Sequence, residues 1–389
     1  MTVPAAGTRG DAPWSYRPWV RAVGVAILLY LFLVGVNGLG AGFRALGEGV
    51  LDSFFRATEN PFVGLMVGIL ATTLVQSSSV TTSMIVGLVA APLNPIPLAN
   101  AIPMIMGANI GTTVTNTLAS LAHMGRKEEF RRAFSVATVH DFFNYMAVLV
   151  LLPLEMLTGF LRTSATWLSD VVSGLGGSDH ESPVKVAIGA GGALIESVLG
   201  GHFPTERTVA IAYILVSAAL IFITLVSIVK VMRSSMQSRL EALVSRALAT
   251  NAWIAIAVGI VATVMVQSSS ITTSLMVPLA GAGVLTLNQA FPVTLGANLG
   301  TTVTAMLAAL AATGANAQAG LTIALVHMLF NLTGIVLIYP YQPIRRLPLM
   351  MARKLADVAV RSRAWAIVYV FGLFYGVPAL FAIFNQVLG

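Results

Sequence analysis

Long stretches of the chain are apolar and carry no charged side chain. Asp, Glu, Lys and Arg are all absent from residues 22–43, 60–125, 208–229, 247–344 and 364–389. Because a helix needs about 20 apolar residues to cross a bilayer, the longest of these stretches must each contain several membrane segments. Breaks rich in proline, glycine or polar residues divide them at 92–97, 288–292 and 314–320. The pattern predicts an all-α membrane protein with several spans.

The composition supports this prediction. Of the 389 residues, 57% are hydrophobic and 10% are charged, and the mean hydropathy is +0.86. A soluble domain carries roughly 25% charged residues, so a water-soluble enzyme, a disordered chain and a fibrous protein are all disfavoured. Cysteine is absent, which excludes a disulfide framework, a thiolate nucleophile and a cysteine-based metal site. We expect neither an enzyme nor a bound organic cofactor.

The chain contains an internal repeat. The segment Gln76–Ser83, QSSSVTTS, recurs as QSSSITTS at Gln267–Ser274. The segment GANIGTTVT, which begins at Gly107, recurs as GANLGTTVT from Gly296. A looser echo relates HDFFN from His140 to HMLFN from His327. Because the three blocks follow one another in the same order, the sequence predicts two homologous halves.

The position of the QSSS blocks predicts how each half crosses the membrane. Each block lies in the middle of an apolar segment whose arms are too short to cross and return, so we expect a re-entrant helical hairpin with the QSSS block at its tip. A half would then comprise a span, a hairpin and two further spans. Three crossings are an odd number, so the second half would be inserted upside down, as in the inverted repeats of secondary transporters with their partly unwound spans.

This layout divides the chain into five parts. They are a cytosolic tail (1–19), a first transport repeat (20–157), an extracytoplasmic loop (158–206), a second, inverted transport repeat (207–344), and a basic linker with a final membrane segment (345–389). The net charge of +7 is concentrated in the predicted cytoplasmic loops, around 126–132, 230–246 and 345–363. This distribution follows the positive-inside rule and argues against a nucleic-acid surface. The last segment, 364–389, is a span, an interfacial helix or another hairpin.

The QSSS blocks allow two interpretations. Their hydroxyls could simply hold neighbouring helices together through hydrogen bonds to backbone carbonyls. Alternatively, a hairpin tip combines the free carbonyls that end one half-helix with the unpaired N–H groups that begin the next. The carbonyls suit a sodium ion, the N–H groups suit an anion, and hydroxyl oxygens suit both. The large amides of Gln76 and Gln267 and the duplication of the block favour this second interpretation.

The GAN blocks and the histidines are interpreted in the same way. The two glycines in each GAN block favour either local unwinding or close helix packing. Asn109, Asn298 and the threonine pairs would add ligand oxygens. His140 and His327 are expected to be neutral and hydrogen-bonded across helices. No His and Glu cluster has zinc spacing, so sodium is the only metal ion that we expect.

These motifs resemble those of the type II sodium–phosphate cotransporter family. That family carries QSSS in both halves, each followed by GAN(I/L)GT(T/S), and the segments Glu128–Phe134 and Ala137–Asn144 look like the family's as well. The resemblance covers about 60–157 and 250–335. It implies sodium-coupled, electrogenic uptake of inorganic phosphate by alternating access, in a protein that forms homodimers in the lipid bilayer.

The resemblance also carries residues over to this chain. Ser77, Ser78, Ser79, Ser268, Ser269 and Ser270 match the substrate and ion motifs, and with Asn109 and Asn298 they form the predicted phosphate-binding set. The predicted sodium-binding set is Gln76, Gln267, Thr112, Thr113, Thr117, Asp141, Asn144, Thr301 and Thr302. Asp141 is the single charge within Ala133–Leu154. It matches an acidic position that the family associates with sodium binding and electrogenic transport.

The chain departs from the family at three places. His123 and Arg126 stand where the animal members have Gln and Asp, which places the second sodium site and the ion stoichiometry in question. The connection 158–206 is short and has no cysteine, which favours a bacterial inner-membrane protein. Two other functions compete with symport: a sodium-independent channel, and a membrane protein that regulates without transporting. A related tetrahedral anion such as arsenate is an alternative substrate.

Overall fold

The structure, a computed structural model, describes residues 18–46, 58–91, 95–175, 183–247, 251–312 and 316–388. Every regular element in these ranges is a helix, so the predicted all-α class is confirmed. Six of the described helices are long and apolar enough to cross a membrane, and shorter apolar helices accompany them. Most of the predicted tail, 1–19, and part of the proline break at 92–97 lie outside the described residues.

The order of helices is similar in the two halves of the chain. The first half contains α1 (Pro18–Leu46), α3 (Pro61–Val75), α4 (Ser78–Val89), α5 (Leu98–Gly111), α6 (Val114–Leu121) and α7 (Lys127–Thr158). The second half contains α10 (Glu206–Ala247), α11 (Ala252–Val266), α12 (Ser269–Ser274), α13 (Met276–Gly281), α14 (Leu287–Leu310) and α15 (Ala317–Ile338). Two local differences stand out: α5 and α6 are separated at Thr112–Thr113 where α14 is continuous, and α12 ends four residues before Pro278, which cannot continue the hydrogen-bond ladder.

The remaining helices connect and follow the two halves. The segment expected to be a loop, 158–206, contains α8 (Phe160–Leu175) and α9 (Pro183–Gly200). The basic linker forms a helix, α16 (Gln342–Arg361). The chain then continues through α17 (Arg363–Ile367), a π-helical segment η2 (Val368–Gly376) and α18 (Val377–Leu388).

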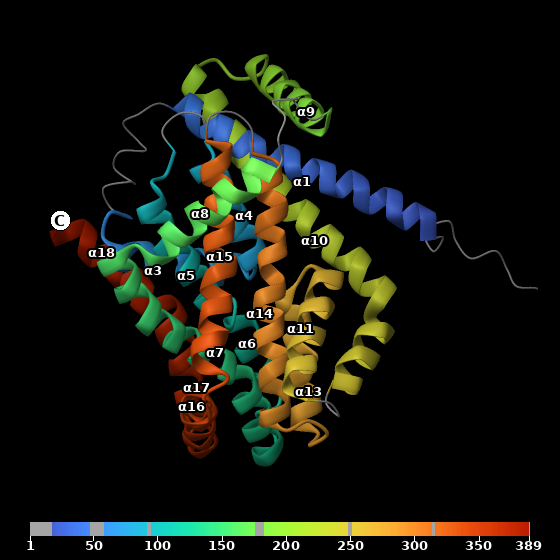
Figure 1. Ribbon diagram of the computed structural model, residues 1–389, viewed down its shortest axis with the longest axis vertical. Coiled ribbons are helices and arrows are strands. Elements are labelled where there is room, and N and C mark those ends of the chain that lie inside the picture. Colours follow the sequence, from blue (N-terminus) through green and yellow to red (C-terminus); the bar gives the residue numbers. More distant parts are fainter. Residues whose placement is uncertain are drawn as a thin grey trace, which may run out of the picture.

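Helices from both halves form the centre of the bundle. In Figure 1, α7, α14 and α15 run along the long axis, and α1 and α10 pack against each other on the outside. The central windows of α7 and α14 are each 72% buried, against 33% for α1 and α10. Of these central helices, α7 carries the HDFFN block of the first half and α14 carries the GAN block of the second half, whereas α1 and α10 present apolar surface outward.

The glycines of the GAN blocks permit very close helix packing. A Cβ atom placed on Gly107 of α5 would lie 2.0 Å from the carbonyl oxygen of Leu65 on α3. At the matching position in α14, a Cβ on Gly296 would lie 1.9 Å from the carbonyl oxygen of Ile256 on α11. Only glycine allows the backbones to approach this closely. Of the two uses predicted for these glycines, the structure shows the packing one in both halves.

Candidate functional site

The QSSS block of the first half joins two helices at a sharp turn. Helix α3 ends at Gln76, whose backbone is left-handed with φ 57°, and Ser77 is extended with φ −154°. The Ser77 hydroxyl accepts a hydrogen bond from the Val80 amide at 3.3 Å and so caps α4. Ser78 and Ser79 form the first turn of α4, where backbone N–H groups have no acceptor within the helix. Both side chains are buried.

The second half repeats this geometry. Helix α11 ends at Gln267 with φ 53°, and the extended Ser268 caps α12 by accepting from the Ile271 amide at 3.4 Å. Ser269 is buried and Ser270 is partly exposed at the start of α12. In each predicted set of three serines, Ser77–Ser79 and Ser268–Ser270, the first hydroxyl accepts a capping hydrogen bond and can still donate its own proton.

Both tip glutamines have a strained backbone. Within the described residues, Gln76 and Gln267 are the non-glycine residues with positive φ. The left-handed conformation costs a non-glycine residue roughly 1–2 kcal/mol, and such strain concentrates at functional sites. In both halves the glutamine amide oxygen accepts a hydrogen bond from a threonine hydroxyl.

Each tip glutamine is held by a threonine that the sequence analysis did not select. Gln76 Oε1 accepts a hydrogen bond from Thr115 Oγ1 at 3.0 Å, and Gln267 Oε1 accepts one from Thr304 Oγ1 at 3.2 Å. Thr115 and Thr304 are the last residues of the duplicated GAN blocks, so the repeat itself carried the signal that could have found them. The Gln76 amide group also donates to the hydroxyl of Tyr375 in η2, at 3.4 Å.

The two halves meet at these tips. Ser79 Oγ of the first tip lies 3.4 Å from Thr304 Oγ1, the same hydroxyl that holds Gln267 of the second tip. On the other side, Asn116 of α6 bonds to Thr273 Oγ1 at 2.7 Å and to Ser274 Oγ at 2.9 Å. Each tip helix thus packs against the GAN-block helix of the opposite half. The structure therefore brings the two predicted serine triads into one region.

Four buried asparagines form a second point of contact between the halves. Asn298 donates to Asn144 Oδ1 at 2.9 Å and to Asn331 Oδ1 at 2.6 Å. Asn109 Oδ1 accepts from Asn331 at 3.0 Å and lies 3.3 Å from Nε2 of His327. The contact of His327 across helices agrees with its predicted hydrogen bonding, whereas both ring nitrogens of His140 are buried and have no hydrogen-bond partner. Both amide protons of Asn298 are used within this network, so any contact with a ligand requires one of these bonds to open.

Asp141 lies in a separate buried cluster. Its Oδ2 accepts a hydrogen bond from the hydroxyl of Tyr369 at 2.6 Å and one from Thr117 Oγ1 at 3.5 Å. Its Oδ1 atom and the hydroxyl of Tyr145 are both buried and have no hydrogen-bond partner. An unpaired carboxylate oxygen is costly at such depth, and it is a ligand that hard cations such as sodium accept. Tyr369 is in η2, outside both repeats, so no repeat pattern could have identified it.

The other predicted sodium ligands bond mainly to their own helices. Thr112, Thr113, Thr301 and Thr302 each donate their hydroxyl proton to a backbone carbonyl three or four residues earlier. This leaves their oxygen lone pairs available to a cation. Asn144 donates to the carbonyl of Asn109 at 2.8 Å. Of these four threonines, Thr113 also lies beside the Asp141 carboxyl, close enough for a hydrogen bond.

His123 and Arg126, where the chain departs from the family, lie between α6 and α7. The Arg126 guanidinium donates to Glu129 at 2.6 Å, and Nδ1 of His123 lies 3.9 Å from the same carboxylate. The arginine is thus neutralised by an acid in the first turn of α7. Among the described residues, no group of three or more His, Asp or Glu side chains could hold a metal ion.

A helical bundle with six apolar helices long enough to span a bilayer, around a buried and duplicated polar centre, defines a multi-pass membrane protein. Residues 31–176 and 220–352 match the protein family described as Na+/Pi-cotransporter. The chain belongs to this family. The matched ranges contain both QSSS blocks, both GAN blocks and Asp141, but they end before η2 and its tyrosines.

Known relatives agree with the family match. The chain is 35% identical to sodium-dependent phosphate transport protein 2B of Bos taurus, over 95% of this chain and 66% of the relative. It is 32% identical to protein 2B of Homo sapiens, over 95% and 66%, and 34% identical to protein 2A of Ovis aries, over 93% and 68%. The chain therefore spans about two thirds of the length of these relatives. No solved structure matches it significantly.

Proposed function

We propose that the protein is a sodium-coupled symporter that takes inorganic phosphate into the cell. One observation carries this proposal: the two QSSS tips have the same strained geometry and contact each other's halves in the interior of a membrane protein. The relatives, by their names, are sodium-dependent phosphate transport proteins. A duplicated polar site between two halves is also the arrangement on which secondary transporters rely.

We place phosphate between the two tips. Ser78, Ser79, Ser269 and Ser270 offer hydroxyl and backbone N–H donors at the start of α4 and α12. The two charge-free stretches that contain the tips, 60–125 and 247–344, have no Lys or Arg. A divalent anion held only by neutral donors needs a cation close by, because burial of an unpaired charge is very costly. The electrostatics therefore favour the co-binding of sodium.

The proposed sodium ligands fall into two groups. Asp141 and Thr117 form one, with the unpaired Oδ1 atom as the principal ligand. The tip glutamines and the threonine pairs of the GAN blocks supply neutral oxygens for the other. If two sodium ions accompany a divalent phosphate, the transported ions together carry no net charge. A third ion at Asp141 would add one net positive charge, which is why we expect electrogenic transport.

Alternating access would move one half against the other around the tips. We propose that α3–α4 and α11–α13 are re-entrant hairpins and that the two halves are inverted. The test uses the absence of native cysteine. Ser173→Cys, in the connection between the halves, should react with an impermeant thiol reagent from outside the cell, and Ser235→Cys, in the later part of α10 in the second half, should not. Reaction of both variants from the same side contradicts the inverted arrangement.

Uptake of labelled phosphate into proteoliposomes tests the function itself. With sodium outside we expect phosphate to accumulate above its external concentration, and with potassium outside we expect no accumulation. A channel would equilibrate phosphate without sodium, and a regulatory protein would move none, so either result overturns symport. Arsenate as competitor measures the breadth of the site. The bacterial inner membrane and the homodimer stay predictions, which cell fractionation and cross-linking can check.

A further inference from the structure

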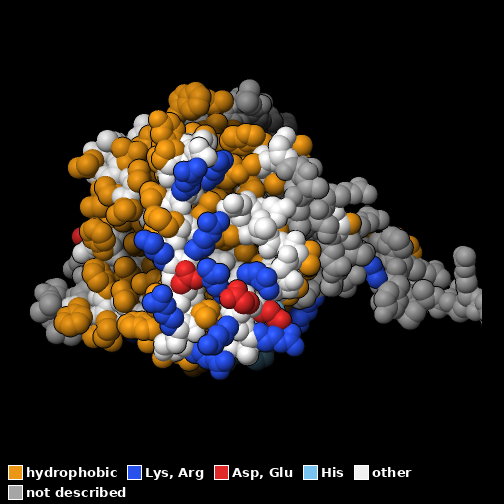
Figure 2. All heavy atoms as spheres, turned by 90° about the horizontal axis from the view of Figure 1, so that it is seen from below, with side chains coloured by type: hydrophobic (Ala, Val, Ile, Leu, Met, Phe, Trp, Pro, Cys, Tyr) orange, Lys and Arg blue, Asp and Glu red, His pale blue; other side chains and the backbone are white. Residues whose placement is uncertain are grey.

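A basic pocket lies beside α16, the helix at the lower end of the molecule in Figure 1. Seen from below, Lys and Arg side chains gather on this end, and hydrophobic surface borders them on one side (Figure 2). The pocket has a volume of about 650 Å³ and is enclosed by the start of α11, the start of α14, the residue that follows α15, and α16. It is therefore formed where several helices of the second half begin or end.

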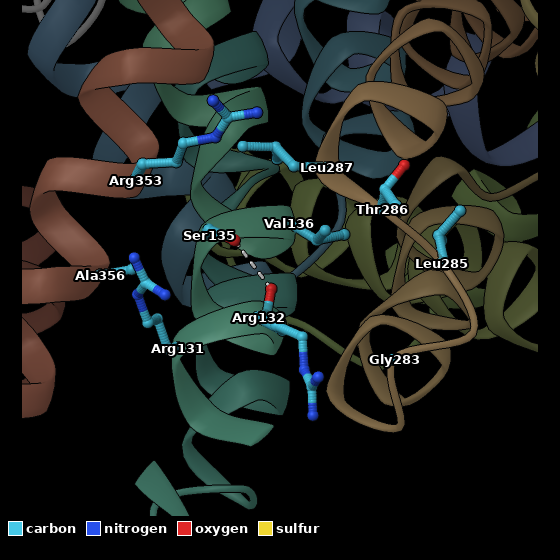
Figure 3. Close-up of a pocket in the computed structure, with 10 residues that line it drawn as sticks. All are labelled: Arg131, Arg132, Ser135, Val136, Gly283, Leu285, Thr286, Leu287, Arg353 and Ala356. Carbon is cyan, nitrogen blue, oxygen red and sulfur yellow. Dashed lines mark hydrogen bonds between the residues drawn. The ribbon is translucent and has the colours of Figure 1, made fainter. Parts of the chain in front are cut away.

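The charge of this pocket is not balanced by acidic side chains. Arg345, Arg346 and Arg353 line it, and none of its described lining residues is Asp or Glu. Figure 3 shows the side chain of Arg353 extending from α16 toward Leu287, at the start of α14. There it donates to a neutral partner, the amide oxygen of Asn288, at 3.1 Å. Within the described part of the chain, the ion pairs involve other arginines, so these three have no carboxylate partner.

An aromatic ring holds one of the three arginines in place. The guanidinium carbon of Arg345 lies over the ring of Tyr339, 5.1 Å from its centre, in a cation–π contact. The Tyr339 ring is fixed in turn by Trp253, with ring centres 5.9 Å apart, and by Phe291, at 5.7 Å. A guanidinium has five N–H donors, so this contact leaves several of them available to an anion. Arg345 is thus a positioned cation at the wall of the pocket.

The surroundings of the pocket favour a lipid over a dissolved anion. Tyr339 directly follows Ile338, the last residue of a helix long and apolar enough to cross a membrane. Trp253 and Tyr341, which are next to lining residues in the sequence, are exposed, and so is Val336 in the last turn of α15. Exposed Trp and Tyr beside arginines at the end of a span are typical of the membrane–water interface, where headgroups lie. Acyl chains could then follow the exposed apolar side chains of α15.

We propose that this pocket binds the headgroup of an anionic phospholipid, with Arg345 as the contact of its phosphate group. The guanidinium suits phosphate oxygens, and basic pockets between helices at the membrane surface are known to bind such headgroups. Arg346 and Arg353 contribute positive potential without having to contact the same group. A zwitterionic headgroup brings its own positive charge and therefore gains less. None of these residues belongs to the proposed phosphate or sodium sets, so the inference does not rest on the proposed function.

Quenching of Trp253 fluorescence by brominated lipids tests this site, because Trp253 packs against the pocket residue Tyr339. The whole chain is placed in phosphatidylcholine nanodiscs, in potassium buffer without sodium. A minor fraction of the lipid is then replaced by brominated phosphatidylglycerol or, in a second series, by brominated phosphatidylcholine. The chain has five tryptophans, so each protein is also measured with Trp253→Phe, and the difference gives the Trp253 signal.

We expect phosphatidylglycerol to quench Trp253 more strongly than phosphatidylcholine at the same fraction. One arginine near an anionic lipid surface is worth roughly a fivefold change in lipid preference, so Arg345→Gln should lower the preference by about fivefold. Arg345→Lys, which keeps the charge, should preserve most of it. The matched control Arg361→Gln removes the same charge from the exposed end of α16, outside the pocket, and should leave the preference unchanged. Quenching by phosphatidylcholine should be equal in all variants, which verifies that Trp253 still faces the bilayer.

Four results would overturn the proposal. Equal quenching by the two lipids in the wild-type protein means that the pocket does not select an anionic headgroup. An unchanged preference in Arg345→Gln means that this arginine does not bind it, and an equal loss in Arg361→Gln means that general surface charge, not the pocket, attracts the lipid. Relief of the quenching by inorganic phosphate, compared with potassium chloride of equal ionic strength, would assign the pocket to a dissolved anion instead.

Discussion

The two halves of this protein have the same geometry at their QSSS tips, but they differ in the helices that follow the tips. At the tips, Gln76 and Gln267 share a left-handed backbone, and each is held by the matching threonine of its GAN block. Behind the tips, the acidic Asp141 of the first half corresponds to Met328 of the second. The shared part is where we propose that phosphate binds between the halves. The unshared part introduces a charge, and there we expect coupling to sodium to be set, apart from the proposed phosphate site.

A second difference has the same character. Asn116 of α6 bonds to Thr273 and Ser274 of the opposite half, whereas the matching position in α14 is the buried Ala305. The Tyr369 hydroxyl, which donates a hydrogen bond to Asp141, belongs to η2. This segment follows both repeats and has no counterpart between them. The π-helical segment is an irregularity that often marks functional sites. The asymmetry is therefore built both from substitutions within the repeat and from an added segment.

The largest effect is expected where the halves are most alike. Gly107→Ala and Gly296→Ala each force a Cβ against a backbone carbonyl, at 2.0 Å and 1.9 Å, and no flexible side chain can move aside. We expect each to lower the free energy of unfolding by on the order of 3 kcal/mol. Thermal unfolding of the purified variants measures this. Gly24→Ala, where nothing lies within 4 Å, is the control. A large difference between the two variants would break the equivalence of the halves.

The serine tips should also respond alike. Ser78→Ala and Ser269→Ala each remove a buried hydroxyl that we place on phosphate. A hydrogen bond to a charged group contributes on the order of 1.5–3 kcal/mol, so the apparent affinity for phosphate should fall roughly 10- to 100-fold. Labelled phosphate uptake at several concentrations gives the value. Ser197→Ala on the exposed side of α9 is the control. Normal uptake by both tip variants contradicts the site assignment.

The sequence predicted the shared features better than the unshared ones. The repeat and the charge-free stretches identified the helical class, the tips and the GAN blocks. Each of these signals can be recognised in short stretches of the sequence alone. They could not show that Gly107 allows close helix packing, that Asn298 donates both amide protons to Asn144 and Asn331, or that Tyr369 donates a hydrogen bond to Asp141. These depend on contacts between residues far apart in sequence. The helices α8 and α9 were also missed, because a mixed-charge segment was interpreted as a loop.

Replacement of Asp141 sharpens the comparison, because it makes the first half resemble the second in charge. Asp141→Gly should still bind phosphate at the tips, but it should lose the third positive charge of the cycle. We expect wild-type uptake to be stimulated by an inside-negative potassium–valinomycin potential, and the variant to be unaffected by that potential or inactive. Wild-type uptake that ignores the potential, or a variant as sensitive to it as wild type, shows that Asp141 does not have this role.

The smallest effect is expected from the residue that lies outside both halves. Tyr369→Phe keeps the ring, which packs against Phe134 and Phe374, and removes only the hydroxyl 2.6 Å from Asp141 Oδ2. The carboxylate would lose the partner that fixes its orientation while keeping its charge. Because one ordinary hydrogen bond is involved, the sodium concentration for half-maximal uptake should rise about twofold to tenfold, with the phosphate affinity at saturating sodium unchanged. Tyr30→Phe, whose hydroxyl bonds to Ala187 on the outer helices, should change neither value. Equal loss of sodium and phosphate affinity in Tyr369→Phe would mean that the hydroxyl supports the whole polar centre, and the separation between a shared substrate site and an asymmetric ion site would then fail.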